Sequence, residues 1–152
     1  MWRFGSTVPA VLSALAILCN AQQSTDRSTV LPQMKHAIAA VKTSETVDER
    51  TSAAERLASL AKKVNRKEIT EQTIADLISL LDSPDDSVRF WVATALGNLG
   101  PSAKAAIPKL QSLLPKADCL NGTITSASGI RYALKELAVT PPPRPNCTPI
   151  AG

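Results

Sequence analysis

Few residues of this chain have the chemistry of a catalytic or metal site. It has one histidine, His36, and three cysteines, at Cys19, Cys119 and Cys147. A zinc site or a catalytic triad needs several such groups at characteristic spacing, and these four show none. The sequence also lacks the motifs C-x-x-C, H-E-x-x-H and G-x-S-x-G and a glycine-rich phosphate loop. We therefore expect a non-catalytic protein with no cofactor and no metal.

The first 21 residues have the three parts of a secretory signal. Residues 1–3 give a short, positively charged start, residues 8–19 are almost wholly apolar, and Ala21 is a small residue before a polar segment. An apolar stretch of about a dozen residues is too short for a membrane-spanning helix, which needs roughly 20. We expect residues 1–21 to be removed and the mature chain to be exported, to the periplasm or the extracellular space, with no membrane span left.

Two alternatives to cleavage stay open. One is an uncleaved anchor or a buried helix, and the other is a lipoprotein acylated on Cys19. Lipid-attachment motifs usually have a small residue before the cysteine, whereas this chain has the bulky Leu18. Cleavage after Ala21 is therefore the favoured interpretation.

Removal of the signal leaves two cysteines, Cys119 and Cys147. Two thiols in an oxidising compartment are most simply interpreted as one disulfide, with two unpaired cysteines as the alternative. The bond would close a loop of roughly 29 residues and stabilise the fold by about 3.5 kcal/mol in the chain-entropy model. It would also hold the proline-rich tail at 140–152, which we expect to run as polyproline II.

The composition favours packed helices and gives no sign of a nucleic-acid partner. Aromatic residues make up only 3% of the chain, while Ala, Leu, Ser and Thr are abundant. Without Arg3 the mature chain has 16 Lys and Arg against 13 Asp and Glu, a net charge of about +3 that is spread along the sequence. Nucleic-acid binders usually gather basic residues on one face, so we expect no nucleic-acid partner.

Apolar residues recur at three- and four-residue intervals in six segments, which predicts six helices and no strands. The stripes begin at Leu31, Ala53, Ile74, Val88, Ile107 and Ile130. Before the fourth helix, Ser83 is expected as the N-cap and Pro84 as the first helical residue. Gly100 is expected to end that helix, and Pro108 to bend the fifth.

The helical pattern repeats with a period of about 40 residues, which is typical of HEAT-type arrays. Arg50-x-x-Ala53-Ala54-x-x-Leu57-x-x-Leu60 matches Arg89-x-x-Val92-Ala93-x-x-Leu96-x-x-Leu99 at an offset of 39 residues. Ala133-Leu134-x-x-Leu137 matches Ala95-Leu96-x-x-Leu99 at an offset of 38 residues. The sequence therefore predicts an all-α fold, a short α-solenoid of three antiparallel helix pairs at 22–139.

The stretch Leu80-Leu81-Asp82-Ser83-Pro84-Asp85-Asp86-Ser87-Val88-Arg89, followed by Ala93-x-Ala95-Leu96-Gly97-x-Leu99-Gly100, resembles a HEAT repeat. The resemblance implies polar contacts between neighbouring repeats from Asp86 and Arg89. It also implies a scaffold that binds another protein through its second helices, although some HEAT-like relatives are enzymes such as lyases. The third repeat matches poorly, because Ala127 replaces an expected arginine and Gly129 is expected to interrupt the helix.

Phe90 is the main candidate for partner contact. On a helical wheel it lies about 200° from Val88, where HEAT repeats usually have a polar residue. A large apolar side chain there either packs beneath the neighbouring repeat or contacts a partner. We expect a partner-binding face around Phe90, Arg89 and Arg50, and a structural role for Trp91. The alternative is binding through the tail by polyproline recognition.

Two weaker patterns complete the sequence. Asn121 and Asn146 both stand in glycosylation acceptor triplets. A basic cluster lies near the end of the second predicted helix and contains Lys62, Lys63, Arg66 and Lys67. Complementing a helix C-terminus is the favoured interpretation of this cluster, and an anion site is the alternative.

We predict that the exported protein begins at Gln22 and carries a bond between Cys119 and Cys147. Intact mass should match a chain that starts at Gln22, and thiol labelling of the unfolded, unreduced protein should give no adduct. A lipid on Cys19 or two labelled cysteines would contradict the prediction. A dimer that is lost on reduction would show that the bond joins two chains.

Overall fold

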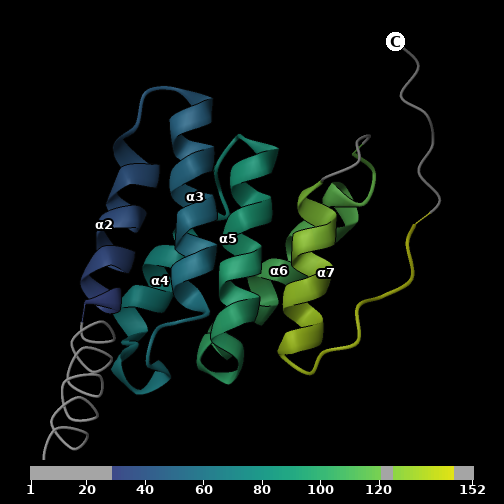
Figure 1. Cartoon of the computed structure of the whole chain (residues 1–152). Helices are drawn as coiled ribbons and strands as arrows, with labels where there is room; N and C mark the ends of the chain where they lie inside the picture. The colour runs from purple at the N-terminus through teal and green to yellow at the C-terminus, as the bar shows by residue number, and fades with distance from the viewer. Residues whose placement is uncertain (1–28, 121–124, 146–152) are drawn as a thin grey trace, which may run out of the picture.

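The computed structural model describes residues 29–120 and 125–145, and in this part three antiparallel helix pairs lie side by side in chain order (Figure 1). The pairs are α2 (Val30–Thr43) with α3 (Val47–Ala61), α4 (Glu71–Leu80) with α5 (Asp86–Leu99), and α6 (Ile107–Ala117) with α7 (Ser126–Glu136). The described residues form no strand. The predicted all-helical, solenoid-like array is confirmed.

Several expectations fall on residues outside this described part. They are the signal at 1–21 with Cys19, the two acceptor asparagines Asn121 and Asn146, and Cys147. Among the helices that are described, none combines the length and the apolar character that crossing a membrane requires.

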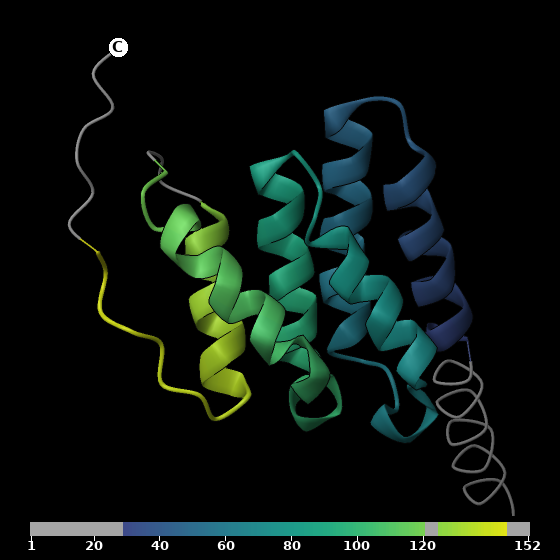
Figure 2. The same cartoon turned by 180° about the vertical axis from the view of Figure 1, so that it is seen from behind.

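The second helices α3, α5 and α7 form one layer, seen in front in Figure 1, and α4 and α6 lie behind them (Figure 2). The core lies between the layers, and most of its large, fully buried side chains are leucines. Its fully buried large side chains include Leu57, Leu77, Leu81, Leu96, Leu99, Leu110, Leu114 and Leu134. Each such leucine contributes about 1.5–3 kcal/mol when removed from water, so the stacked pairs share one continuous core.

Local signals set the helix ends, and the structure corrects two predicted ones. Gly100 ends α5 with a φ of 55°, as predicted. Asp85, not Ser83, is the N-cap of α5, and the Ser83 hydroxyl accepts a hydrogen bond from the Asp85 amide at 3.2 Å. Pro108 does not bend a helix, because the preceding 3-10 turn η2 (Gly100–Ala106) delays the start of α6 and places this proline in its first turn.

Gly129 does not interrupt α7, contrary to the sequence expectation. It lies inside the helix, and an added Cβ would be 2.5 Å from the Phe90 carbonyl oxygen of α5. The missing side chain therefore lets the two helices approach closely. The neighbouring Ala127 is buried, so a long arginine at that position would have to displace core side chains. The weak repeat match in this segment reflects close packing.

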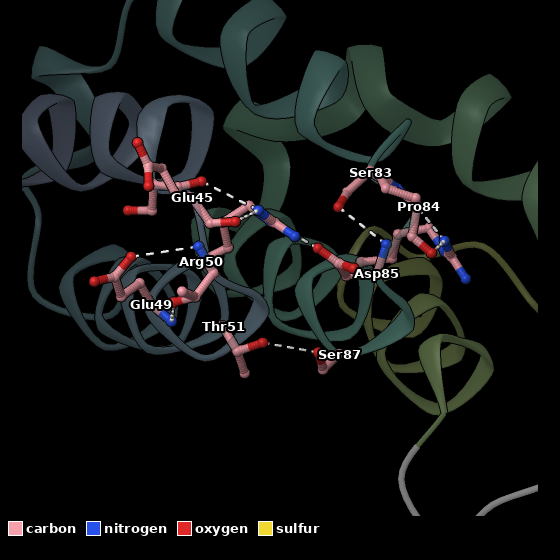
Figure 3. Close-up of polar contacts among 11 residues, drawn as sticks. Glu45, Glu49, Arg50, Thr51, Ser83, Pro84, Asp85 and Ser87 are labelled. Atoms are coloured by element: carbon pink, nitrogen blue, oxygen red, sulfur yellow. Dashed lines mark hydrogen bonds and ion pairs between the residues drawn. The ribbon is translucent and has the colours of Figure 1, made fainter.

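A ladder of polar contacts joins the starts of the second helices (Figure 3). Arg50 Nε donates to Asp85 Oδ2 of the next repeat at 2.7 Å, and its Nη1 donates to the carbonyl oxygens of Ser44 and Glu45. The Thr51 and Ser87 hydroxyls lie 2.8 Å apart. Arg50 thus fixes its own turn and the offset between the first two pairs.

The second repeat places Asp86 and Arg89 in a related arrangement. Arg89 Nη1 donates to the carbonyl oxygens of Ser83 and Pro84, and Nη2 donates to Asp86 Oδ1 at 2.8 Å. Asp86 in turn accepts from the backbone amide of Ser126 at 2.9 Å and from its hydroxyl at 2.5 Å. Asp86 therefore makes the contact to the third pair, while Arg89 fixes the turn of its own repeat.

We predict that Arg50→Ala lowers the free energy of unfolding by about 1.5–3 kcal/mol, the range for hydrogen bonds to charged groups. The side chains of Arg50 and Asp85 are only 22% and 14% exposed. Lys42→Ala is the control, because the Lys42–Asp76 pair is 43% and 34% exposed and should be worth less than about 1 kcal/mol. Urea denaturation measures both, and equal losses would show that Arg50 has no special role.

Candidate protein-binding surface

All three aromatic side chains of the described residues lie on the second-helix layer. Phe90 and Trp91 are on α5, and Tyr132 is on α7. Phe90 and Trp91 are half-buried, while Tyr132 is 38% exposed. The exposed part of an aromatic ring is apolar area that a partner can still cover and remove from water. We call this surface the aromatic seam. It consists of Phe90, Trp91 and Tyr132, with Gly97 and Gly129 beneath the rings.

Phe90 packs against the neighbouring repeat and keeps part of its ring accessible. A Cβ on Gly129 would lie 3.1 Å from Phe90 Cδ2, so the ring rests over the α7 backbone. The rings of Phe90 and Trp91 meet edge to face, with centroids 4.8 Å apart and an angle of 74°. Phe90 is thus packed against the next repeat and half-buried, while contact with a partner stays a prediction.

Tyr132 makes the reciprocal contact from α7 to α5. Its Cε1 would lie 2.9 Å from a Cβ on Gly97, and its hydroxyl donates to Asn98 Oδ1 at 2.8 Å. Each helix therefore presents a glycine beneath an aromatic ring of the other. This double contact holds both rings in fixed positions.

Asn98 joins all three pairs, and the sequence analysis did not single it out. It is 7% exposed, donates through Nδ2 to the Ala58 carbonyl oxygen of α3 at 2.9 Å, and accepts from Tyr132. A buried amide must have partners, because an unsatisfied one costs about 1–3 kcal/mol. The available signal was a polar residue between Gly97 and Leu99, but both of its partners are remote in sequence.

The other two predicted contact residues do not join the aromatic seam. The structure directs the guanidinium groups of Arg50 and Arg89 to the turns at the start of their helices, where they bind Asp85, Asp86 and backbone carbonyls. Their side chains are 22% and 20% exposed. Both arginines thus position the helices that carry the rings.

Arg131 of α7 holds the proline-rich tail at Pro142. The Arg131 guanidinium binds Asp118 with two hydrogen bonds, of 2.9 and 2.6 Å, and donates from Nη1 to the Pro142 carbonyl oxygen at 2.8 Å. The Asp118 side chain is 2% exposed, and its hydrogen bonds raise the pKa of Arg131 above its ordinary value. Arg131 therefore links the end of α6, α7 and the tail.

The fold is a short α-solenoid, and its second-helix layer carries aromatic rings that are partly exposed. Residues 34–120 match the model of the HEAT-repeat family, which is more than half of the chain, and the chain therefore belongs to this family. The match ends before α7, the helix in which Gly129 departs from the repeat pattern. No curated protein and no solved structure matches the chain.

The described residues hold no group of three potential metal-ligating side chains. HEAT arrays offer extended surfaces for other proteins, and aromatic side chains are enriched in the cores of protein interfaces. The aromatic seam is therefore an apolar, partly exposed surface whose rings are held by packing between α5 and α7.

We predict that Tyr132 ionises above pH 10. Burial raises its pKa above the ordinary value of 10.0, and the negative charge of Glu136 adds to the shift. The stability from neutral Tyr132 is fully present below pH 10.0 and is lost as the pH rises through the folded-state pKa. Because the chain has one tyrosine, absorbance at the tyrosinate band reports it alone.

Denatured protein gives the reference midpoint for this titration. Glu136→Gln should lower the folded midpoint and still leave it above the denatured one, since burial is the larger cause. Equal midpoints in folded and denatured protein would contradict the packing of Tyr132 against α5.

Proposed function

We propose that this protein is an exported, non-catalytic scaffold that binds another protein through its second-helix layer, at the aromatic seam. The supporting observation is that Phe90 and Trp91 on α5 and Tyr132 on the neighbouring α7 keep their rings partly exposed. Rings of this kind are the usual anchors of protein interfaces, in which a few aromatic residues supply most of the binding energy. Export is supported by the three-part pattern of residues 1–21.

The rigidity of the seam supports the same function. Gly97 and Gly129 let the α5 and α7 backbones contact the rings, and the Tyr132–Asn98 hydrogen bond fixes one of them. Ordering a mobile side chain on binding costs about 0.5–1.5 kcal/mol. Rings that are already fixed avoid much of that cost.

The surroundings of the seam also suit a protein partner. Ser128, Lys135 and Glu136 are exposed on α7 beside Tyr132, one turn before it and one turn after it. A polar rim around apolar anchors is the common arrangement in protein interfaces. A photo-crosslinking residue at Ser128 should therefore capture the partner in the native host.

We predict that Ser128→Arg weakens binding to the captured partner by at least about tenfold, because a bulky cation would stand at the edge of the seam. Gln111→Arg, at an exposed position of α6, is the matched control and should leave the affinity unchanged. Isothermal calorimetry with the purified partner measures both. Equal affinities for the two variants would place the partner elsewhere on the protein.

Phe90→Ala should act on both binding and stability, since the ring is half-buried. We expect a loss of binding of about 1–3 kcal/mol and a loss of folding stability of about 2 kcal/mol, below the 3–5 kcal/mol of a fully buried phenylalanine. Binding is compared below the unfolding transition. A full core-sized loss of stability with unchanged binding would remove Phe90 from the interface.

A second candidate is binding through the tail. The Arg131 hydrogen bond to the Pro142 carbonyl holds a segment whose residues 142–145 are exposed, and exposed proline-rich segments are ligands of aromatic grooves. A chain that ends at Thr140 separates the two candidates. Retained binding favours the aromatic seam, and lost binding favours the tail.

A further inference from the structure

The excess positive charge of this chain is concentrated in one loop, contrary to the even spread expected from the sequence. The basic loop, residues 62–68, holds four cations and one carboxylate, a net charge of +3, whereas the whole chain has +4. The loop follows α3 and contains the 3-10 turn η1 (Arg66–Glu68). It borders a shallow hollow of about 560 Å³.

Only part of this charge is used within the fold. Arg66 Nη2 donates to the Asn98 carbonyl oxygen in the last turn of α5 at 3.3 Å, so complementing a helix end explains Arg66. The Glu68 carboxylate accepts from the side chain of Asn65. The ammonium groups of Lys62, Lys63 and Lys67 make no hydrogen bond or ion pair with the residues that the structure describes.

An apolar groove begins where the basic loop ends. It has a volume of about 430 Å³ and is lined by Ile69, Ile74, Ala75, Ile78 and Ala105, with Thr70, Glu71 and Ser102 among its polar residues. It lies between α4 and η2. Ile69 and Ile78 are half-buried, and Ala75 and Ala105 are exposed. The groove therefore has room for an aliphatic side chain against alkyl groups.

We propose that the basic loop and the groove together form a second interaction surface, which takes an acidic protein segment carrying an aliphatic side chain. The carboxylates of the segment pair with Lys62, Lys63 and Lys67, and the aliphatic side chain enters the groove. The two parts are continuous, since Glu68 borders the hollow and Ile69 lines the groove. Charge complementarity selects the acidic segment.

A peptide segment fits the groove better than an anionic membrane does. Thr70, Glu71 and Ser102 line it with hydroxyl and carboxylate oxygens, which can accept hydrogen bonds from peptide N–H groups. The surface lies on the first-helix side and does not depend on the aromatic seam.

The test is a titration of isotope-labelled full-length protein with capped peptides, followed by amide shifts in NMR spectra. The first peptide is Glu-Glu-Leu-Glu-Glu, and its controls are Glu-Glu-Ala-Glu-Glu and Lys-Lys-Leu-Lys-Lys. We expect the shifts to cluster at residues 62–78 and 102–105. The alanine peptide should bind about tenfold more weakly, because alanine buries less apolar area in the groove than leucine does. The lysine peptide should not bind there.

Charge-matched variants test the loop. Lys62→Glu/Lys63→Glu/Lys67→Glu should weaken the leucine peptide by at least about tenfold, since three attractions become repulsions. Lys35→Glu/Arg56→Glu/Lys135→Glu changes the net charge equally at other exposed positions and should have little effect. Equal losses in the two triple variants would overturn the proposal, because net charge alone would then explain the binding.

Ala75→Gln tests the groove without a change of charge. The longer polar side chain should abolish the preference of the protein for the leucine peptide over the alanine peptide. Ser52→Gln, at an exposed position of α3, should keep that preference. An unchanged preference in Ala75→Gln would overturn the groove assignment. So would vesicles of anionic lipid that bind through the three lysines while the peptide does not. Phe90→Ala should leave peptide binding intact, so failure here is distinguishable from failure at the aromatic seam.

Discussion

The close approach of α5 and α7 is the constraint on which the rest of the structure depends. Two glycines, Gly97 and Gly129, bring each backbone into contact with an aromatic ring of the other helix. Interiors are packed as densely as organic crystals, so a single added methyl group at Gly129 would have to move a backbone carbonyl. This spacing lets Tyr132 reach Asn98 and, through it, links all three pairs.

Hydrophobic stacking alone would leave the offset between neighbouring pairs loosely defined. The polar contacts at the helix starts define it, because Arg50–Asp85 and Asp86–Ser126 are satisfied at one offset only. No buried side-chain nitrogen or oxygen of the described residues lacks a hydrogen-bond partner. A shift of one repeat against another would leave several such groups unpaired, each at a cost of about 1–3 kcal/mol.

The sequence predicted the parts of this structure that depend on nearby residues. Apolar spacing located all three helix pairs, and Gly100 marked the end of α5. It failed where distant residues decide. A glycine inside a helical pattern costs about 1 kcal/mol relative to alanine, and only the position of Phe90 shows that Gly129 is needed for packing. The partners of Asn98 lie 40 and 34 residues away, so no local pattern indicates its role.

The candidate sites follow the same division. Phe90 stood out because its wheel position contradicts its apolar side chain, and the structure leaves it half-buried against α7. Tyr132 packs on Gly97 only because α7 lies beside α5, so the residues around it in the sequence do not indicate this contact. The charge of the basic loop was visible, but its meaning depends on the groove beside it, which forms only when η2 packs near α4.

The tail obstructs stacking of a further repeat on the α7 end of the array. A repeat protein with two open ends can add further copies, and head-to-tail contacts that do not close produce filaments. Here the tail leaves α7 on the outer side of the array (Figure 1), where a following repeat would stack, and its Pro142 carbonyl accepts a hydrogen bond from Arg131 of α7. Proline also has no N–H to offer a neighbouring chain. Lengthening of this array at the α7 end, by gene duplication or by polymerisation, is therefore obstructed.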